Sequence, residues 1–200
     1  MTEPLRQSDL EVAAATLDCD LAAIIAVNQV ESRGRGFHSN GQPVILFERH
    51  IMRRRMRHNG IDAATVGLAE HTWPDLVNRL TGGYKGGLTE NYRLKLACEI
   101  HKTSALESAS WGRFQIMGFH WSRLGYSSAM EFSECMSRSE QDQLDAFCRF
   151  IVADPALHNA LCTLNWAEFA RRYNGKAYKK NRYDEKLAAA YATAQETLNA

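Results

Sequence analysis

Apolar residues recur at three- and four-residue spacing along most of the chain, which is the pattern of amphipathic helices. Ser8 is placed to cap a first helix that runs to about Thr16. A second helix is expected over residues 20–31, and an arginine-rich helix over about residues 51–59. Residues 91–102 predict a further helix. Its expected inward stripe is Tyr92, Leu96, Ala97 and Ile100.

The carboxyl-terminal half shows the same periodicity, with signals for where helices start and stop. Ser128 and Ser139 each precede an acidic residue three positions on, which is typical of a helix amino terminus. Asp154-Pro155 places a proline at the first position of the next helix. A helix over residues 166–173 is ended by Asn174-Gly175. A last amphipathic helix contains Tyr183, Leu187, Ala190, Tyr191, Ala194 and Leu198.

Only one segment has the pattern of β-structure. Asn40-Gly41 is a turn signal and residues 44–47 form a short apolar strand, so residues 37–48 are expected to form a small hairpin. Residues 60–89 have the weakest pattern, and the four glycines around Tyr84 and Lys85 predict a flexible loop. We therefore expect a mainly α fold with a small β-hairpin, in a single domain over residues 1–200.

The composition is that of an ordinary folded domain. Apolar residues make up 45% and charged residues 24% of the 200 positions, which is enough chain to bury a core. The net charge of +1 argues against a general binder of polyanions. Positive charge gathers in two basic runs, within residues 49–57 and 171–186. These runs are either solvated faces or surfaces that hold an anionic polymer.

The five cysteines are odd in number and no pair has CxxC spacing, so free thiols in a reducing compartment are expected. No HExxH motif, Cys/His cluster or nucleotide-binding motif is present, so we expect no metal and no cofactor. The amino terminus lacks an apolar signal core, and the early apolar run at residues 21–27 is too short to span a membrane. Synthesis and initial residence in the cytoplasm are therefore expected.

Glu31 is the most informative single residue. It continues the apolar stripe of Ile24 and Val27 and lies at the carboxyl end of its predicted helix. Partial burial and the negative end of the helix dipole both disfavour the ionised carboxylate. A raised pKa is what a general acid near neutral pH requires. The alternative is a helix-end glutamate that bonds the loop after it.

Two later segments bear on this choice. Gly112 and Gly118 bracket a short apolar segment that contains Gln115. This segment is either a buried turn or a cleft wall, where Gln115 binds a sugar and Trp111 stacks on one. Tyr173 and Asn174 end a helix side by side, as a packed tyrosine and a cap or as further cleft residues.

Three segments in order then resemble the goose-type lysozyme and lytic transglycosylase superfamily: Glu31-Ser32, Gly112 to Met117, and Ala170 to Gly175. The resemblance is closer still to the N-acetylmuramidase domain of phage endolysins. It extends over Glu31 to Phe37, Pro43 to His50, Ser108 to Gly118 and Tyr173 to Tyr191. Nearly the whole chain is covered, and residues 60–90 are the least characteristic part.

The resemblance implies a lysozyme-like fold that cleaves the β-1,4 bond between N-acetylmuramic acid and N-acetylglucosamine. Glu31 takes the place of the acid that protonates the glycosidic oxygen. The substrate-binding residues are expected to be Ser32, Trp111, Gln115, Tyr173 and Asn174. The expected partner is the glycan strand of bacterial peptidoglycan, bound by a monomer without nucleic acid or membrane insertion. Such a protein acts on the wall after release from the host cytoplasm.

Glycoside hydrolysis usually needs a second carboxylate. Glu48, at the end of the predicted strand, is the expected partner of Glu31, unless it pairs with Arg49 or another arginine of that run. Asp184 is a weaker candidate and a better cap for the last helix. His38, His50 and His120 are expected to be surface or core histidines, and only His50 is close in sequence to a candidate acid.

Two other functions remain open at this point. Lytic transglycosylases share the fold and use one glutamate, because the 6-hydroxyl of muramic acid replaces water. A non-catalytic domain that binds glycan or nucleic acid would instead use the basic runs and aromatic residues such as Tyr84.

Overall fold

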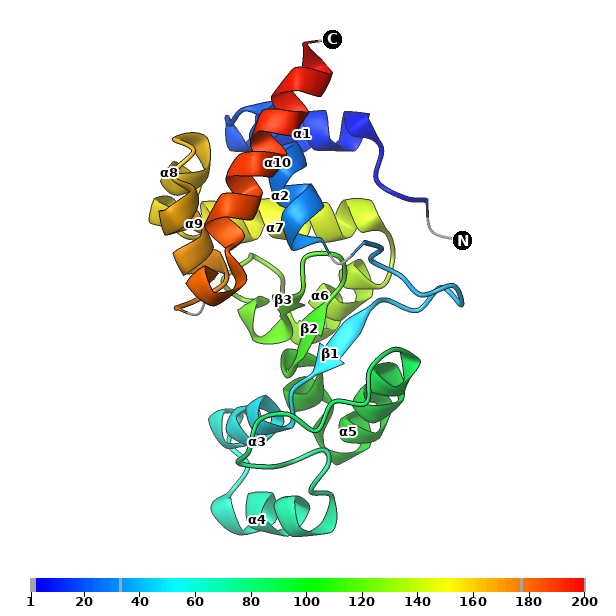
Figure 1. Cartoon of the computed structure of the whole chain (residues 1–200). Coiled ribbons are helices and arrows are strands. Elements are labelled where there is room, and N and C mark those ends of the chain that lie inside the picture. The colour runs from blue at the N-terminus through cyan, green and yellow to red at the C-terminus, as the bar shows by residue number, and fades with distance from the viewer. Residues whose placement is uncertain (1–2, 33, 177, 200) are drawn as a thin grey trace.

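The computed structural model describes residues 3–32, 34–176 and 178–199, and most of these are helical (Figure 1). The amino-terminal helices are α1 (Gln7–Leu17), α2 (Leu21–Glu31), α3 (Arg49–His58), α4 (Ala63–Thr72) and α5 (Leu88–Glu107). The carboxyl-terminal helices are α6 (Ala129–Met136), α7 (Glu140–Val152), α8 (Pro155–Cys162), α9 (Trp166–Tyr173) and α10 (Tyr183–Leu198). Short 3-10 helices occupy Gly118–His120 and Tyr178–Asn181.

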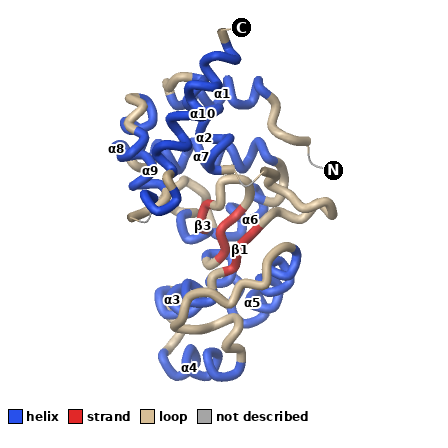
Figure 2. Tube along the Cα trace, viewed as in Figure 1, coloured by secondary structure: helices blue, strands red, loops and turns tan. Residues whose placement is uncertain are grey.

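The helices form two groups with a small sheet between them (Figure 2). One group contains α1, α2 and α7 to α10, and within it α10 packs along α2 (Figure 1). The other contains α3, α4 and the first part of α5. The sheet consists of β1 (Ile45–Phe47), β2 (Ala109–Trp111) and β3 (Ile116–Met117). This confirms a mainly α, lysozyme-like fold.

Side-chain caps place the helix starts as the sequence predicted. Asp20 accepts a hydrogen bond from the Ala22 amide at the start of α2. Ser128 and Ser139 cap α6 and α7 by accepting from the residue three positions on. Asp154 caps α8 ahead of Pro155. Because each cap satisfies amide groups that the helix leaves unbonded, these boundaries are set locally.

The expected hairpin over residues 37–48 is only partly correct. A turn does form at Asn40-Gly41, and a single bridge joins Phe37 to Pro43. Strand β1, however, pairs antiparallel with β2, so that Ile45 lies opposite Trp111. Strand β2 in turn pairs with β3. The partner of β1 is more than sixty positions away, which a turn signal in the local sequence cannot indicate.

Two expectations for residues 60–102 are wrong. Asp62 caps α4, a ten-residue helix, within the segment that we expected to be the least structured part of the chain. On α5, Tyr92 is 60% exposed, so it does not lie on the inward stripe. Its neighbours Glu90 and Arg93 are buried instead and form an ion pair of 2.6 Å. The inward face was predicted from apolar residues alone, and such a prediction cannot find a face that buries a charged pair.

The cysteines are not all free. Cys19, at the corner between α1 and α2, is joined to Cys162 at the end of α8 by a disulfide with a Cα–Cα distance of 4.8 Å. Cys98, Cys135 and Cys148 are free thiols. His158 lies beside the disulfide, so a Cys/His cluster exists in space although its spacing in the sequence hides it. With both sulfurs bonded to each other, neither is a thiolate ligand for a metal.

Gly118 shows how closely the sheet packs against α5. A β-carbon at this position would overlap the carbonyl oxygen of Leu106. Only glycine therefore fits where β3 ends, and its place beside the end of α5 is fixed by the backbone itself. Among the helices that the structure describes, none is long and apolar enough to cross a membrane.

Candidate active site

Glu31 is the last residue of α2 and is half-buried. Its side-chain oxygen Oε1 accepts a hydrogen bond of 2.7 Å from the amide Nδ2 of Asn174. Asn174 is the residue at which α9 ends, and Gly175 follows with a φ of +77°. Two helix carboxyl ends therefore meet at this carboxyl group.

The surroundings of Glu31 favour its protonated form. Burial raises the pKa of Glu31 from its ordinary value of 4.5 to about 7, against the lowering effects of the Asn174 amide and the Lys186 charge. Its place at the carboxyl end of α2 acts in the same direction as burial. A carboxyl group that holds its proton near neutral pH can donate it to a leaving oxygen.

Tyr173 connects this helix end to the turn between β2 and β3. Its hydroxyl donates a hydrogen bond of 3.0 Å to the Phe114 carbonyl, and its ring stacks on Phe169. Burial and the nearby Glu31 carboxyl hold the pKa of the Tyr173 hydroxyl well above its usual value. Tyr173 is therefore a neutral hydrogen-bond donor, and it lies close enough to Glu31 for the two groups to interact electrostatically.

Gln115 lies in the same turn with a φ of +52°, and its side chain is engaged locally. The amide Nε2 donates to the Gly112 carbonyl at 2.8 Å, and Oε1 accepts from the Ser110 hydroxyl at 2.9 Å. This is the arrangement of a glutamine that satisfies its own turn. The residue is half-buried, so part of its surface can contact a ligand. Its role in the cleft wall is therefore part of the proposed function.

Sequence patterns did not identify Arg113, which ties the turn to the helix that carries Glu31. Its guanidinium donates to Asn28 Oδ1 on α2 at 2.8 Å and to the Gly34 carbonyl in the loop after Glu31. The same group pairs with the buried Glu140 at 3.1 Å. These contacts hold the residues on both sides of Glu31 against the β2–β3 turn.

Gln143 fixes the other side of this turn. It is buried, accepts from the Arg113 amide at 2.7 Å and donates to the Gly36 carbonyl at 3.3 Å. β-Carbons at Gly36 and Gly112 would both overlap its side chain. Gly36 and Gly112 are therefore explained by the buried side-chain amide of Gln143 on α7, which no local pattern indicates.

The expected role of Trp111 is corrected by its position. Only 4% of the residue is exposed, and its indole nitrogen donates to the Leu106 carbonyl at 3.1 Å. The ring packs edge-on against Phe132. No face of the ring is free to stack on a sugar, because Trp111 is part of the hydrophobic core.

Ser32, the residue after Glu31, ends α2 with its backbone amide bonded to the Asn28 carbonyl at 3.3 Å. It is half-buried. Its side chain makes no hydrogen bond to the part of the protein that the structure describes. The hydroxyl is therefore available to a ligand that lies beside Glu31.

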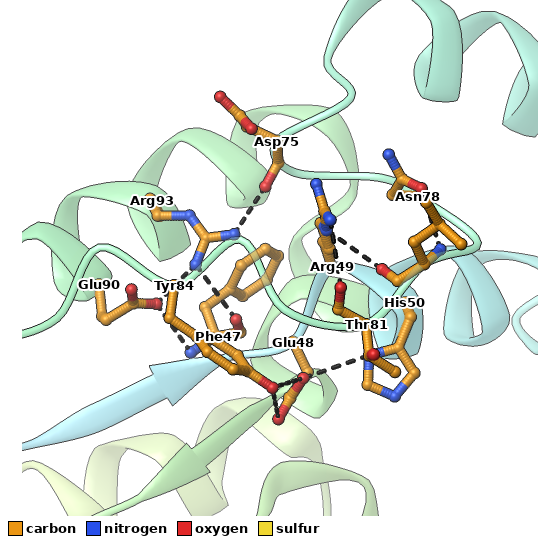
Figure 3. Close-up of polar contacts among 11 residues, drawn as sticks. Phe47, Glu48, Arg49, His50, Asp75, Asn78, Thr81, Tyr84, Glu90 and Arg93 are labelled. Carbon is orange, nitrogen blue, oxygen red and sulfur yellow. Dashed lines mark hydrogen bonds and ion pairs between the residues drawn. The ribbon is translucent and has the colours of Figure 1, made fainter.

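Glu48 follows β1 at the point where the chain enters α3. The hydroxyl of Tyr84 lies 2.9 Å from both of its carboxylate oxygens, and His50 Nδ1 lies 3.2 Å from Oε2 (Figure 3). Arg49 does not pair with it; its guanidinium binds the carbonyls of Leu80 and Thr81 instead. Glu48 is thus hydrogen-bonded by a phenol and lies beside an imidazole, and the expected alternative of an Arg49 pair is wrong.

The arginines of both basic runs are largely engaged within the protein. Arg53 pairs with Glu70 at 2.7 Å and Arg55 with the buried Glu107 at 2.8 Å. In the second run, Arg171 and Arg172 both pair with Glu168. These four arginines have partners that reduce their attraction for an external polymer.

The site predicts a specific dependence of activity on pH. Because a general acid must be protonated, the kcat/KM of a soluble glycan should fall as pH rises through about 7, the pKa of Glu31. The Asn174 amide lowers that pKa, so Asn174→Ala should move the falling limb to higher pH. Asn159→Ala, at an exposed site on α8, is the control and should leave the profile unchanged. A limb that stays in place or moves to lower pH in Asn174→Ala would contradict this account.

Together, a lysozyme-like helical fold and a carboxyl group with a raised pKa at a helix end define the class of glycan-cleaving enzymes. Comparison with known proteins identifies the family. Residues 20–195 match the family model described as Muramidase, N-acetylmuramidase, and the chain belongs to this family. It is therefore a peptidoglycan-degrading muramidase, a glycoside hydrolase.

Comparison with solved structures gives the same result. The crystal structure of the Burkholderia AP3 phage endolysin is similar, with 46% sequence identity and a TM-score of 0.92. The similarity covers 98% of this chain and 74% of the endolysin chain. No curated protein matched the sequence.

Proposed function

We propose that the chain hydrolyses the β-1,4 bond between N-acetylmuramic acid and N-acetylglucosamine, with Glu31 as the general acid. The observation that carries this proposal is the half-buried Glu31, whose pKa is about 7 and whose Oε1 is bonded to Asn174. In this role Oε2, the oxygen not bonded to Asn174, carries the proton to the glycosidic oxygen. The Asn174 amide then stabilises the carboxylate that forms, because an amide donor favours the charged state.

Glu48 is the proposed second carboxylate. It belongs to the junction of β1 and α3, whereas Glu31 belongs to the helical group on the other side of the sheet (Figure 1). No arginine neutralises Glu48 among the described residues, and its neighbours are Tyr84 and His50. A carboxylate held in this way can activate water or stabilise an oxocarbenium ion.

The proposed substrate-binding groups are those grouped around Glu31. Ser32 offers a hydroxyl that bonds none of the described residues, while Tyr173 and Asn174 come from the end of α9. Gln115 contributes the turn that Arg113 and Gln143 hold in place. These groups support the binding of a polar glycan rather than an apolar ligand.

A second candidate function is that of a lytic transglycosylase. One observation favours it: Tyr84 already lies at hydrogen-bond distance from both oxygens of Glu48. If the hydrogen bonds from Tyr84 prevent Glu48 from activating water, the 6-hydroxyl of muramic acid attacks the anomeric carbon in place of water. That chemistry needs only Glu31.

Mass analysis of digested peptidoglycan separates the two. We expect reducing, hydrated muropeptides from the wild type, whereas a transglycosylase gives anhydro ends that are lighter by one water. Glu48→Gln should lower the rate by roughly 10²-fold. Glu134→Gln, an exposed glutamate on α6, is the matched control. Anhydro products, or full activity of Glu48→Gln, would favour the single-acid mechanism.

We further propose that the enzyme acts as a monomer and reaches the wall after release from the host cytoplasm. The similarity to a phage endolysin supports this proposal. The internally paired arginines support a glycan rather than a nucleic acid as partner. Light scattering at micromolar concentration tests the oligomeric state, and a dimer mass would overturn it.

A further inference from the structure

Tyr84 makes the closest contact to Glu48 in the structure. Its hydroxyl is 2.9 Å from Oε1 and 2.9 Å from Oε2, so a single phenolic proton is shared across the carboxylate (Figure 3). Burial and the Glu48 carboxylate raise the pKa of the Tyr84 hydroxyl, so it remains a donor. On the other side of the carboxylate, His50 Nδ1 approaches Oε2 to 3.2 Å. Among the described residues, the phenol makes the side-chain hydrogen bond to this carboxylate, while His50 Nδ1 lies near it without a hydrogen-bond partner.

The loop that carries Tyr84 is fixed on its amino-terminal side by Arg49. The guanidinium donates to the Leu80 carbonyl at 3.1 Å and to the Thr81 carbonyl at 3.1 Å (Figure 3). A β-carbon at Gly83, where φ is +82°, would lie only 3.0 Å from that guanidinium. The glycine thus lets the loop close over Arg49.

Glu90 fixes the loop on its carboxyl-terminal side. Its Oε1 accepts from the amides of Lys85 at 2.6 Å and Gly86 at 3.0 Å. Its Oε2 accepts from the Phe47 amide at 3.2 Å, directly before Glu48 in the chain. One buried carboxylate therefore ties the segment after Tyr84 to the strand end that carries Glu48. The loop expected from the glycines forms, and hydrogen bonds attach it on both sides of Tyr84.

The backbone on both sides of Tyr84 is held by Arg49 and Glu90, and the residue itself is 45% exposed. Besides Glu48, the Tyr84 hydroxyl contacts the backbone of Gly82 in the same loop. Because Arg49 and Glu90 attach the loop independently, removing the hydroxyl should leave the loop in place and chiefly change what the Glu48 carboxylate contacts.

We propose that Tyr84 is a positioning residue, which the clamped loop holds over Glu48 so that its hydroxyl fixes the orientation of this carboxylate for reaction. This inference rests on the proposed catalytic role of Glu48. A freely rotating carboxylate would present its oxygens to water or to the sugar in the right direction only part of the time, and fixed geometry is a large source of rate.

The test uses Tyr84→Phe, which keeps the ring, and a soluble oligosaccharide of alternating N-acetylglucosamine and N-acetylmuramic acid. We expect kcat to fall roughly tenfold with KM unchanged, as for an interaction realised only in the transition state. In a Glu48→Gln background the same change should cause no further fall, because contacting residues that act together are not additive. Tyr92→Phe, an exposed tyrosine on α5, is the control and should match the wild type.

Each other outcome overturns a different statement. If Glu48→Gln is inactive and Tyr84→Phe has the wild-type kcat, the positioning role is wrong while the proposed function stands. If Tyr84→Phe raises KM alone, or if the two changes are additive, Tyr84 contacts substrate directly and does not act through Glu48. If Glu48→Gln is fully active, the role of Glu48 fails and that of Tyr84 fails with it. Thermal unfolding of each variant shows that the fold is intact.

Discussion

Replacing Glu31 by glutamine is expected to abolish lysis of purified peptidoglycan while leaving the protein folded. Glutamine has the shape of the protonated acid and can still accept the hydrogen bond that Asn174 donates to Oε1. It cannot donate a proton to a glycosidic oxygen. The expected loss of rate is roughly 10²–10⁴-fold, which is the usual contribution of general acid catalysis.

The same variant should be more stable than the wild type, but only at high pH. The folded-state pKa of Glu31 is about 7, above its ordinary value of 4.5. The folded protein therefore binds the proton more tightly, and stability falls as pH rises from 4.5 through 7. Glu31→Gln removes this fall. The gain should be near zero at pH 4 and roughly 1–3 kcal/mol at pH 8.

Urea unfolding at the two pH values, together with a turbidity assay on purified walls, measures both effects. Glu196→Gln, an exposed glutamate on α10, controls for the loss of one negative charge. Lysis by Glu31→Gln at a rate comparable to the wild type would remove Glu31 as the acid. A stability gain that is equal at both pH values would contradict the statement that the pKa of Glu31 is raised in the folded protein.

The helices could largely be predicted because their boundaries are set by neighbouring residues. Ser139 caps α7 through the amide three positions on, and Asp154 caps α8 beside its proline. Such contacts join residues two to four apart, so they are visible in the sequence. The sheet joins β1 to β2 across more than sixty positions, and nothing local specifies that pairing.

The candidate site was predictable in part, for a related reason. Glu31 and Asn174 end separate helices, and the local sequence predicted each helix end. In the structure, Asn174 Nδ2 lies 2.7 Å from Glu31 Oε1. Arg113 and Gln143 carried none, because they act through contacts to segments far along the chain. Trp111 was assigned wrongly, since its sequence neighbours do not show that its ring packs into the core against Phe132.

The Cys19–Cys162 disulfide shows the same limit. The two residues are separated by 143 positions, and each has apolar helical neighbours that are typical of a buried thiol. Their Cα atoms are 4.8 Å apart only because α8 packs beside the corner between α1 and α2. Cysteine spacing could not show this pairing.

Glu90→Ala is expected to lower the free energy of unfolding by roughly 3–5 kcal/mol, because it breaks a buried ion pair and leaves one charge without its partner. Glu90 is fully buried and its carboxylate accepts 2.6 Å bonds from Arg93 and from the Lys85 amide. Arg93 is 4% exposed and would remain in place as a buried cation. The amides of Gly86 and Phe47 would lose their acceptor as well.

The pH dependence of this loss has a definite sign. Although burial opposes ionisation, the Lys85 and Gly86 amides and the Arg93 charge hold the pKa of Glu90 below its ordinary value of 4.5. The ionised carboxylate therefore stabilises the fold above that value, and the contribution is lost as pH falls through the lower, folded-state pKa. The difference between Glu90→Ala and the wild type should be largest near pH 7 and should shrink in acid.

Chemical unfolding near pH 7 checks the size of the effect. Glu99→Ala, an exposed glutamate on the same helix, should change stability by no more than about 0.5 kcal/mol. The double variant Glu90→Leu with Arg93→Met should recover part of the loss, since it removes both charges, but not the part due to the loop and strand amides. If Glu90→Ala unfolds within about 1 kcal/mol of the wild type, the Glu90 carboxylate is not what holds the Tyr84 loop against the end of β1. In that case the Glu48 site must be ordered by Arg49 alone.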